Sequence, residues 1–167
     1  MKTTFKREFK AKAMLDARSI ENFIAMTRKS ITVGGRRRMV TAPAIHNLIF
    51  VKVDRAQLQQ IKKDINFLHN TLTKVDGVLS PIIIPSKDME QFIGVTTKSL
   101  EQLIYLDSLE TNLSKGTRVR ITGGEFAGYE GVLMRVKGAR DRRVVLSIDG
   151  VVAVAMAAID ADMIEKM

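Results

Sequence analysis

The chain has no cysteine and no tryptophan among its 167 residues, and it has only two tyrosines. The lack of cysteine excludes disulfides, thiol nucleophiles and thiolate metal sites, and it suits a reducing compartment, so we expect a cytoplasmic protein. The scarcity of aromatic residues disfavours recognition of single strands by stacked bases. No apolar run approaches the ~20 residues that span a bilayer, and MKTTFKREFK has no apolar signal core, so we expect no membrane partner.

Acidic residues are scarce in the first third of the chain. Residues 1–63 hold fifteen basic and four acidic residues, a net charge of +11, whereas residues 64–114 carry −4 and residues 115–167 carry +2. A basic excess of this kind favours association with a polyanion or an acidic protein surface. The alternative is a solvated surface that only keeps the protein soluble, and the charge alone leaves both interpretations open.

No group of residues is typical of catalysis or metal binding. The two histidines, His46 and His69, lie on separate segments without a carboxylate cluster, and a metal site needs several converging ligands. The glycine-rich TGGEFAGYEG lacks the Gly-Lys-Ser/Thr ending of a phosphate-binding loop and leads into a strand pattern. We therefore expect a protein that is not an enzyme and that uses no cofactor and no metal.

The first 106 residues show a mixed helix and strand pattern. Thr4 is positioned to cap a helix over about residues 5–18, with Phe9, Ala13 and Ala17 on its buried stripe. The run LIFVKV, residues 48–53, is typical of a central buried strand.

Later signals in the same region are stronger. Asp54 followed by Gln57 resembles a capping box and predicts a helix to about Ile65. Ser86 can cap a further helix. We expect an α+β fold in which helices flank an antiparallel sheet over residues 1–106.

After a polar linker at residues 107–114, only short strand patterns follow. Asp149-Gly150 is a hairpin turn signal between two of them. Residues 115–167 therefore predict a second domain, a small β-barrel of five strands, because closure hides strand edges.

Gly34-Gly35 predicts a tight hairpin whose return strand begins with three arginines. Successive strand residues point to opposite faces, so Arg37 would face away from Arg36 and Arg38. Cations on both sides of a hairpin tip suit contact with phosphates in a groove, and the alternative is a charged, soluble hairpin end.

The stretch KGTRVRITGGEFAGYEGVLMRVKG, residues 115–138, alternates as two strands around a glycine-rich turn. Phe126 and Tyr129 flank Gly128 in that turn. We expect Phe126 to pack inside the barrel, whereas Tyr129 fits both packing and a role as an exposed anchor for a protein partner.

The same stretch resembles a KOW motif. Together with KTTFKRE near the start and IHNLIFVKV in the middle, it makes the whole chain similar to the NusG family of transcription elongation factors. The segments TTFKRE and RITGGEFAGYEGVLMRV are most similar to the UpxY-type antiterminators of surface-polysaccharide operons. The resemblance implies an N-terminal NGN domain, an α/β sandwich, followed by an SH3-like KOW barrel.

The resemblance also implies partners and site residues. The NGN domain would bind the clamp helices of the largest RNA polymerase subunit and suppress pausing, the hairpin would approach DNA near the transcription bubble, and the KOW domain would contact a ribosomal protein or Rho. By position, the polymerase-binding residues are Thr3, Thr4, Phe5, Lys6, Arg7, Ile45, His46, Asn47, Leu48 and Phe50. The DNA-proximal residues are Arg36, Arg37 and Arg38, and the KOW partner residues are Phe126, Tyr129 and Asp149.

Three positions depart from the family pattern. The family begins with a Trp-Tyr strand before the point where this chain starts, so the first strand is expected to be truncated or short. His46 replaces a usual proline. Asp149 stands where the general factor has an aromatic residue, and a carboxylate enters an apolar pocket only with a desolvation cost, so polymerase binding is favoured over Rho binding.

A second class of function competes with this one. A ribosome-associated or RNA-binding KOW protein would bind RNA tightly through residues 115–167, with an affinity that falls steeply with salt. The modest charge of +2 on that region disfavours this alternative.

Overall fold

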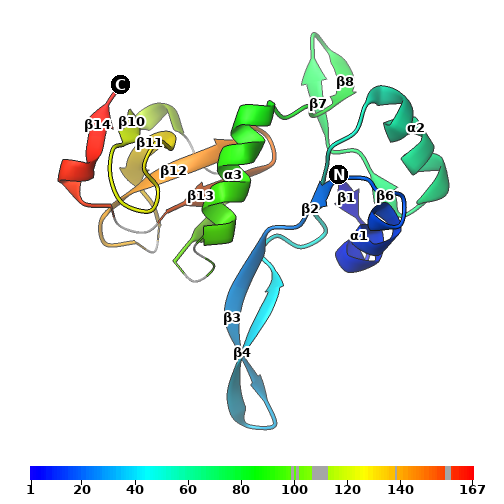
Figure 1. The fold of residues 1–167 in the computed structure, drawn as a ribbon, viewed down its shortest axis with the longest axis horizontal. Helices are drawn as coiled ribbons and strands as arrows, with labels where there is room; N and C mark the ends of the chain where they lie inside the picture. The colour runs from blue at the N-terminus through cyan, green and yellow to red at the C-terminus, as the bar shows by residue number, and fades with distance from the viewer. Residues whose placement is uncertain (99, 101, 107–112, 138, 157–158) are drawn as a thin grey trace. The chain divides into compact units, whose positions relative to one another are not determined.

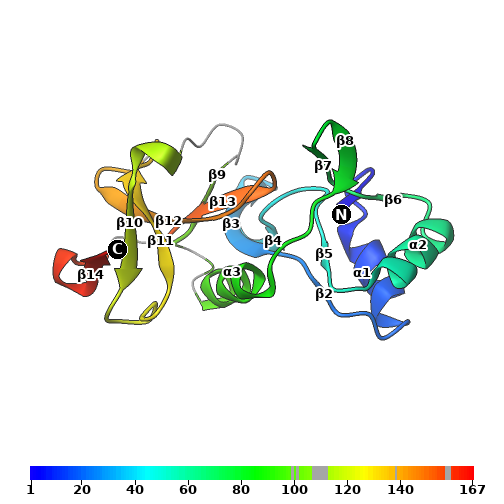
Figure 2. The ribbon, with the colours of Figure 1, turned by 90° about the horizontal axis from the view of Figure 1, so that it is seen from above.

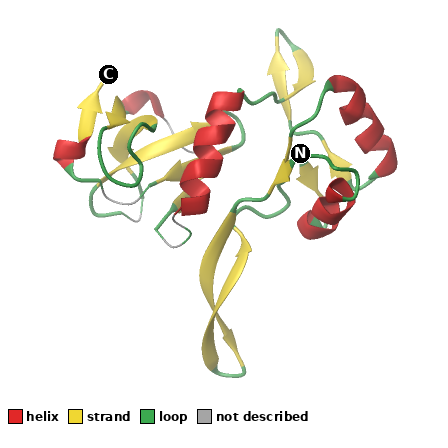
Figure 3. Cartoon of the chain, viewed as in Figure 1, coloured by secondary structure: helices red, strands yellow, loops and turns green. Residues whose placement is uncertain are grey.

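The structure, a computed structural model, describes residues 1–167 except 99, 101, 107–112, 138 and 157–158. It is an α+β protein with mostly antiparallel strands (Figures 1 and 3). In chain order the elements are β1 (Lys2–Thr3), α1 (Glu8–Asp16), β2 (Asn22–Phe23), β3 (Met26–Val33), β4 (Arg36–Pro43), β5 (Phe50–Val51), α2 (Arg55–Asp64), β6 (Leu68–His69), β7 (Leu72–Val75), β8 (Val78–Pro81), α3 (Ser86–Lys98), β9 (Ile104–Leu106), the 3-10 turn η1 (Leu113–Lys115), β10 (Thr117–Ile121), β11 (Glu130–Arg135), β12 (Arg142–Ile148), β13 (Val152–Ala155), the 3-10 turn η2 (Ala161–Met163) and β14 (Ile164–Lys166).

The chain divides into two compact units, Met1–Ile83 and Ile84–Met167. Residues 84–106, which the sequence pattern assigned to the first domain, lie in the second unit. The reason is tertiary packing, because β9 pairs with β13 and α3 lies against β12. Most of the predicted linker, residues 107–112, lies outside the described residues.

The first unit is built on short strands joined by backbone hydrogen bonds. Strand β1 pairs with β6 on one side, while Thr3 N–H donates to Asn47 O at 2.9 Å and Ile49 N–H donates to Met1 O at 3.0 Å on the other. Strand β5 then pairs with β2. This arrangement brings the start of the chain beside residues more than forty positions away.

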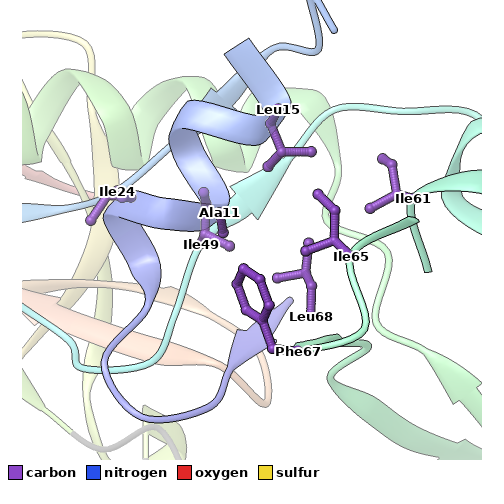
Figure 4. Close-up of a cluster of buried hydrophobic side chains, with 8 residues drawn as sticks. All are labelled: Ala11, Leu15, Ile24, Ile49, Ile61, Ile65, Phe67 and Leu68. Carbon is purple, nitrogen blue, oxygen red and sulfur yellow. The ribbon is translucent and has the colours of Figure 1, made fainter. Parts of the chain in front are cut away.

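The two helices of this unit bury apolar side chains against those strands (Figure 4). Figure 4 shows Leu15 of α1 and Ile61 of α2 pointing into the same cluster as Ile49. Burial of each such side chain contributes about 1.5–3 kcal/mol. The buried members are Ala11, Leu15, Ile24, Ile49, Ile61, Ile65, Phe67 and Leu68.

Helix α1 differs from its prediction. It begins at Glu8, its N-cap is Arg7 without a side-chain cap, and its buried residues are Glu8, Ala11 and Leu15. Phe9, which the predicted stripe placed inside, is 54% exposed. The helix starts later than predicted because Phe5 and Lys6 adopt a left-handed turn and not the first helical turn, and its buried side runs through Glu8, Ala11 and Leu15 and not through Phe9.

Helix α2 begins with the predicted capping box. Gln57 N–H donates to Asp54 Oδ1 at 2.8 Å, and Asp54 N–H donates to Gln57 Oε1 at 3.1 Å. These bonds satisfy two backbone donors that a helix start leaves unpaired.

We expect Asp54→Ala to lower the free energy of unfolding of the first unit by about 1 kcal/mol, because the side-chain acceptor is lost. Urea titration followed by NMR signals of the first unit measures this change. Asp54→Asn keeps an acceptor and is the control, and equal destabilisation by both variants would contradict the role of the cap.

Two antiparallel hairpins complete the first unit. Strands β3 and β4 form a long two-stranded ribbon around Gly34 and Gly35, which have φ values of 57° and 75° as the predicted turn requires. Figure 1 shows this ribbon extending away from α1 and α2 of the same unit. The shorter β7–β8 hairpin exposes several apolar residues, namely Leu72, Val75, Val78 and Leu79.

The second unit contains one antiparallel sheet with the strand order β14-β10-β11-β12-β13-β9 (Figures 1 and 2). Among the described residues no pairing joins the edge strands β14 and β9, so the predicted closure into a five-stranded barrel is not found. Residues 104–106, which we expected in the first domain, form β9 and add a sixth strand at one edge, because Ile104 and Leu106 pack on the cluster around Val145 and Ala153.

Candidate functional site

The turn before α1, residues 4–7, holds Phe5 at φ 55° and Lys6 at φ 54°. Residues with a Cβ adopt this left-handed region only at an energetic cost. Lys6 N–H donates to Asn47 Oδ1 at 2.8 Å, and Asn47 N–H donates to the carboxyl group of Glu8. These contacts fix residues 4–7, which we call the Phe5 turn.

The turn leaves the large aromatic side chain of Phe5 84% exposed to solvent. Glu8, which accepts the hydrogen bond from Asn47 N–H, is only 2% exposed. A buried acidic side chain normally requires a hydrogen-bond partner, and the backbone N–H of Asn47 is the partner of Glu8 here. Strained backbone that is held by several specific contacts is a feature of functional sites, so the Phe5 turn is a candidate contact surface.

Basic side chains lie over the rings of Phe5 and Phe67. The Arg7 guanidinium lies 5.6 Å from the Phe5 ring centroid and 5.2 Å from that of Phe67, and the Lys10 ammonium lies 5.6 Å from the Phe67 centroid. Cation–π contacts of this kind contribute about 0.5–1 kcal/mol at exposed sites. These residues combine an exposed aromatic ring with positive charge, and this combination fits an acidic protein surface with apolar residues.

The predicted polymerase-binding residues separate into two groups in the structure. Thr3, Leu48 and Phe50 are buried, at 5%, 5% and 6% exposure, so they present almost no surface to a partner. Phe5, Lys6, Arg7 and His46 are exposed, and Thr4, Ile45 and Asn47 are half-buried. Of the exposed group, Phe5, Lys6 and Arg7 lie in the Phe5 turn, and half-buried Asn47 is bonded to Lys6.

The β3–β4 ribbon is the second candidate surface. Its register pairs Val33 with Arg36, Thr32 with Arg37 and Ile31 with Arg38, so Arg37 faces away from Arg36 and Arg38, as predicted. Within residues 26–43 the sequence has five basic residues and no acidic one. All five are exposed: Arg28, Lys29, Arg36, Arg37 and Arg38.

The dimensions of the ribbon suit a duplex groove. Eight residues in each strand reach about 26 Å at ~3.3 Å per residue. A two-stranded ribbon fits the major groove of DNA, which is about 12 Å wide. The ribbon contains no aromatic residue, so it offers no platform on which single-stranded bases could stack.

In the second unit, the predicted partner residues do not form one exposed cluster. Phe126 is 7% exposed and packs with its ring centroid 6.2 Å from that of half-buried Tyr129. Asp149 is exposed in the β12–β13 turn, where Ser147 Oγ lies 3.4 Å from its Oδ1. The predicted packing of Phe126 is confirmed.

A cleft of about 540 Å³ opens beside β10, β11 and β12, and Asp149 and Glu130 both line it. Arg120 donates to the Glu130 carboxylate at 2.8 Å, and this hydrogen bond holds the pKa of Glu130 below its ordinary value. The cleft has basic and acidic groups on its rim, so its charge does not select one class of ligand.

Several residues of these surfaces could not be identified from the sequence pattern. Glu8 bonds to Asn47, 39 positions later, and Arg7 lies over both Phe5 and Phe67, which are 62 positions apart, so no local signal connects these residues. The exposed Phe9 was assigned to the core because it shares an apolar stripe with Ala13 and Ala17.

Comparison with models of known protein families found no match, and comparison with curated proteins found none either. No helix in the described part of the chain has the length and apolar character needed to cross a membrane. Among the described residues, no three His, Asp or Glu side chains are grouped in a way that could hold a metal ion.

Proposed function

We propose that this protein is a NusG-like transcription elongation and antitermination factor, specialised for a particular operon of the surface-polysaccharide type. In this proposal the first unit is an NGN domain and the sheet of the second unit is a KOW domain. The protein acts in the cytoplasm, where it binds RNA polymerase without carrying out a reaction.

The observation that carries the proposal is the Phe5 turn. An exposed aromatic residue on a strained, fixed backbone, with Arg7 beside it and Lys10 over the Phe67 ring, is suited to docking on a protein surface that is both acidic and apolar. The clamp helices of the polymerase are the proposed partner. A ligand of this type shifts a mobile enzyme towards its closed form by its greater affinity for that form.

The β3–β4 ribbon supports the second part of the proposal. Its cations lie on both faces and reach beyond the body of the first unit, so the ribbon can contact duplex DNA while the Phe5 turn holds the polymerase. Phosphate contacts are independent of sequence, so they position the factor and leave the choice of operon to other contacts.

We expect the double variant Phe5→Ala/Arg7→Ala to retain core RNA polymerase at least about tenfold less well than the wild type, because it loses both the aromatic anchor and a charge. Co-purification from native cells with a tagged full chain, followed by identification of partners, measures this. The matched control is Leu79→Ala/Lys74→Ala, which removes one exposed apolar residue and one exposed cation from the β7–β8 hairpin.

Equal loss of polymerase in the two double variants would show that the Phe5 turn is not the contact surface. Recovery of ribosomal proteins in place of polymerase with the wild type would overturn the proposal and favour the ribosome-associated alternative.

A further inference from the structure

The connection between β11 and β12 concentrates the positive charge of the second unit. Residues 135–143, which we call the β11–β12 tip, hold five basic residues and one acidic residue, a net charge of +4. The other residues of the range 115–167 hold four basic and six acidic residues, a net charge of −2. The small total for this range therefore conceals one strongly basic end. Residue 138 of the tip lies outside the described residues.

Two arginines of the tip lie directly opposite each other. The register of the sheet pairs Arg135 of β11 with Arg142 of β12, and both side chains are exposed. The Cβ atoms of residues paired in this way are about 4.5–5.5 Å apart, and like charges at that separation destabilise a sheet. An anion between the two guanidinium groups would replace this repulsion by two charge-assisted hydrogen bonds.

The sheet itself supplies no such anion in the part of the chain that the structure describes, where neither arginine has an ion pair with a carboxylate. A pair on the neighbouring strands shows the contrast. Arg120 of β10 lies opposite Glu130 of β11 and donates to its carboxylate at 2.8 Å. The same sheet thus balances one exposed arginine with a cross-strand acid and places a second arginine opposite another.

Apolar residues hold the tip in a fixed shape. Val136 is 7% exposed and, with Ala139, packs in the same cluster as Val145 and Ala153. Ala139 N–H donates to Val136 O at 3.1 Å and closes the turn between them. A backbone that is already ordered lowers the cost of binding. The exposed cations that this backbone presents are Arg135, Lys137, Arg140 and Arg142.

The tip is separate from the predicted partner residues of the second unit. Successive turns between antiparallel strands lie at alternate ends of a sheet. The β11–β12 tip is therefore at the opposite end of these strands from Phe126 and Tyr129, which precede β11, and from Asp149, which follows β12. A protein partner at those turns would leave the tip free for a second ligand.

We infer that the β11–β12 tip binds the phosphates of a nucleic-acid backbone, with one phosphate between Arg135 and Arg142. Lys137 and Arg140 of the same connection supply cations for neighbouring phosphates. Guanidinium groups bind phosphate oxygens in bidentate fashion, and a repeating phosphodiester suits four exposed cations. The tip has no aromatic side chain on which bases could stack, so this contact is independent of sequence. The inference goes beyond the proposed function, which assigns nucleic-acid contact to the β3–β4 ribbon.

Fluorescence anisotropy of the full chain with a labelled single-stranded RNA or a labelled DNA duplex, over a salt series, tests the tip. The chain carries Arg36→Ala, Arg37→Ala and Arg38→Ala, so that the ribbon adds little to binding. We expect the further double change Arg135→Ala/Arg142→Ala to weaken binding at least about tenfold at 0.1 M salt, because two phosphate contacts are lost. The slope of log affinity against log salt should become shallower by about 1.4 with RNA or about 1.8 with the duplex.

The matched control is Arg118→Ala/Lys166→Ala, which removes two exposed cations from β10 and β14 of the same unit. A loss with RNA alone in the tip variant identifies RNA as the source of the phosphates, and a loss with the duplex alone identifies DNA. Equal losses in the tip and control variants with both oligonucleotides would overturn the inference, because total charge would then govern binding. An unchanged affinity of the tip variant for both would overturn it as well.

A stability measurement separates a binding role from a structural one. Amide exchange at Met156, whose N–H donates to Val144 O at 2.9 Å, reports the sheet. Without oligonucleotide, we expect Arg142→Gln to slow this exchange about twofold or more, because the repulsion from Arg135 is removed, although the same change weakens nucleic-acid binding. Faster exchange would show that the arginine pair supports the fold, and it would overturn the inference. Neither measurement involves polymerase, so this inference and the proposed function fail separately.

Discussion

Truncation of Phe92 to alanine is expected to destabilise the second unit by about 3–5 kcal/mol and to leave the first unit unchanged. Phe92 is fully buried on α3, and α3 belongs to the second unit because it packs against β12. Removal of a large core side chain costs both its transfer free energy and the cavity that remains.

Native-state amide exchange separates the two units. Met156, whose N–H donates to Val144 O, reports the second unit, and Ile65, whose N–H donates to Ile61 O at 2.8 Å, reports the first. Ile61→Ala is the matched control, because Ile61 is buried in the core of the first unit and its loss should affect Ile65 alone. A fall in protection at Ile65 in the Phe92 variant would show that α3 supports the first unit, as the sequence pattern suggested.

The second large effect concerns the β3–β4 ribbon. We expect the triple variant Arg36→Ala, Arg37→Ala and Arg38→Ala to bind double-stranded DNA roughly 10²-fold more weakly at 0.1 M salt, because up to three phosphate contacts are lost. The slope of log affinity against log salt should become shallower by about 2.7, since each contact contributes about 0.9.

Fluorescence anisotropy with a labelled duplex over a salt series measures both quantities. The control variant replaces Arg55, Lys62 and Lys63 of α2 by alanine, which removes the same net charge from another exposed part of the first unit. An equal change of slope in the two triple variants would mean that overall charge, and not the ribbon, governs DNA binding.

Features set by neighbouring residues could be predicted from the sequence. Gly34-Gly35, the Asp54–Gln57 capping box and the Asp149-Gly150 turn all formed as expected. Each depends on backbone angles or hydrogen bonds within four residues, so the local pattern contains the necessary information.

Features set by distant residues could not be predicted in this way. The start of α1 depends on Asn47, which accepts from Lys6 and bonds to Glu8 about forty residues away. The placement of β9 depends on its pairing with β13, about fifty residues later. No local pattern carries that information, because tertiary packing determines where α1 starts and which strand β9 pairs with.

The residues Leu48 and Phe50 show how one prediction limited another. The apolar run predicted a buried strand, and both side chains are buried. The same burial removes them from any contact surface, although the family resemblance assigned them to polymerase binding. Of the exposed candidates that remain, Phe5, Lys6 and Arg7 lie at one turn.

The Phe5 turn has a consequence for synthesis of the chain. Its shape depends on a bond from Thr4 N–H to Phe67 O at 3.2 Å and on the bonds to Asn47, so these contacts close loops of more than forty residues. During synthesis from the N-terminus, residues 3–8 emerge before Asn47, and their set of partners is complete only when Phe67 has also left the exit tunnel. A nascent chain therefore completes the Phe5 turn only when β6 joins β1, and shorter nascent chains lack the Phe67 contact.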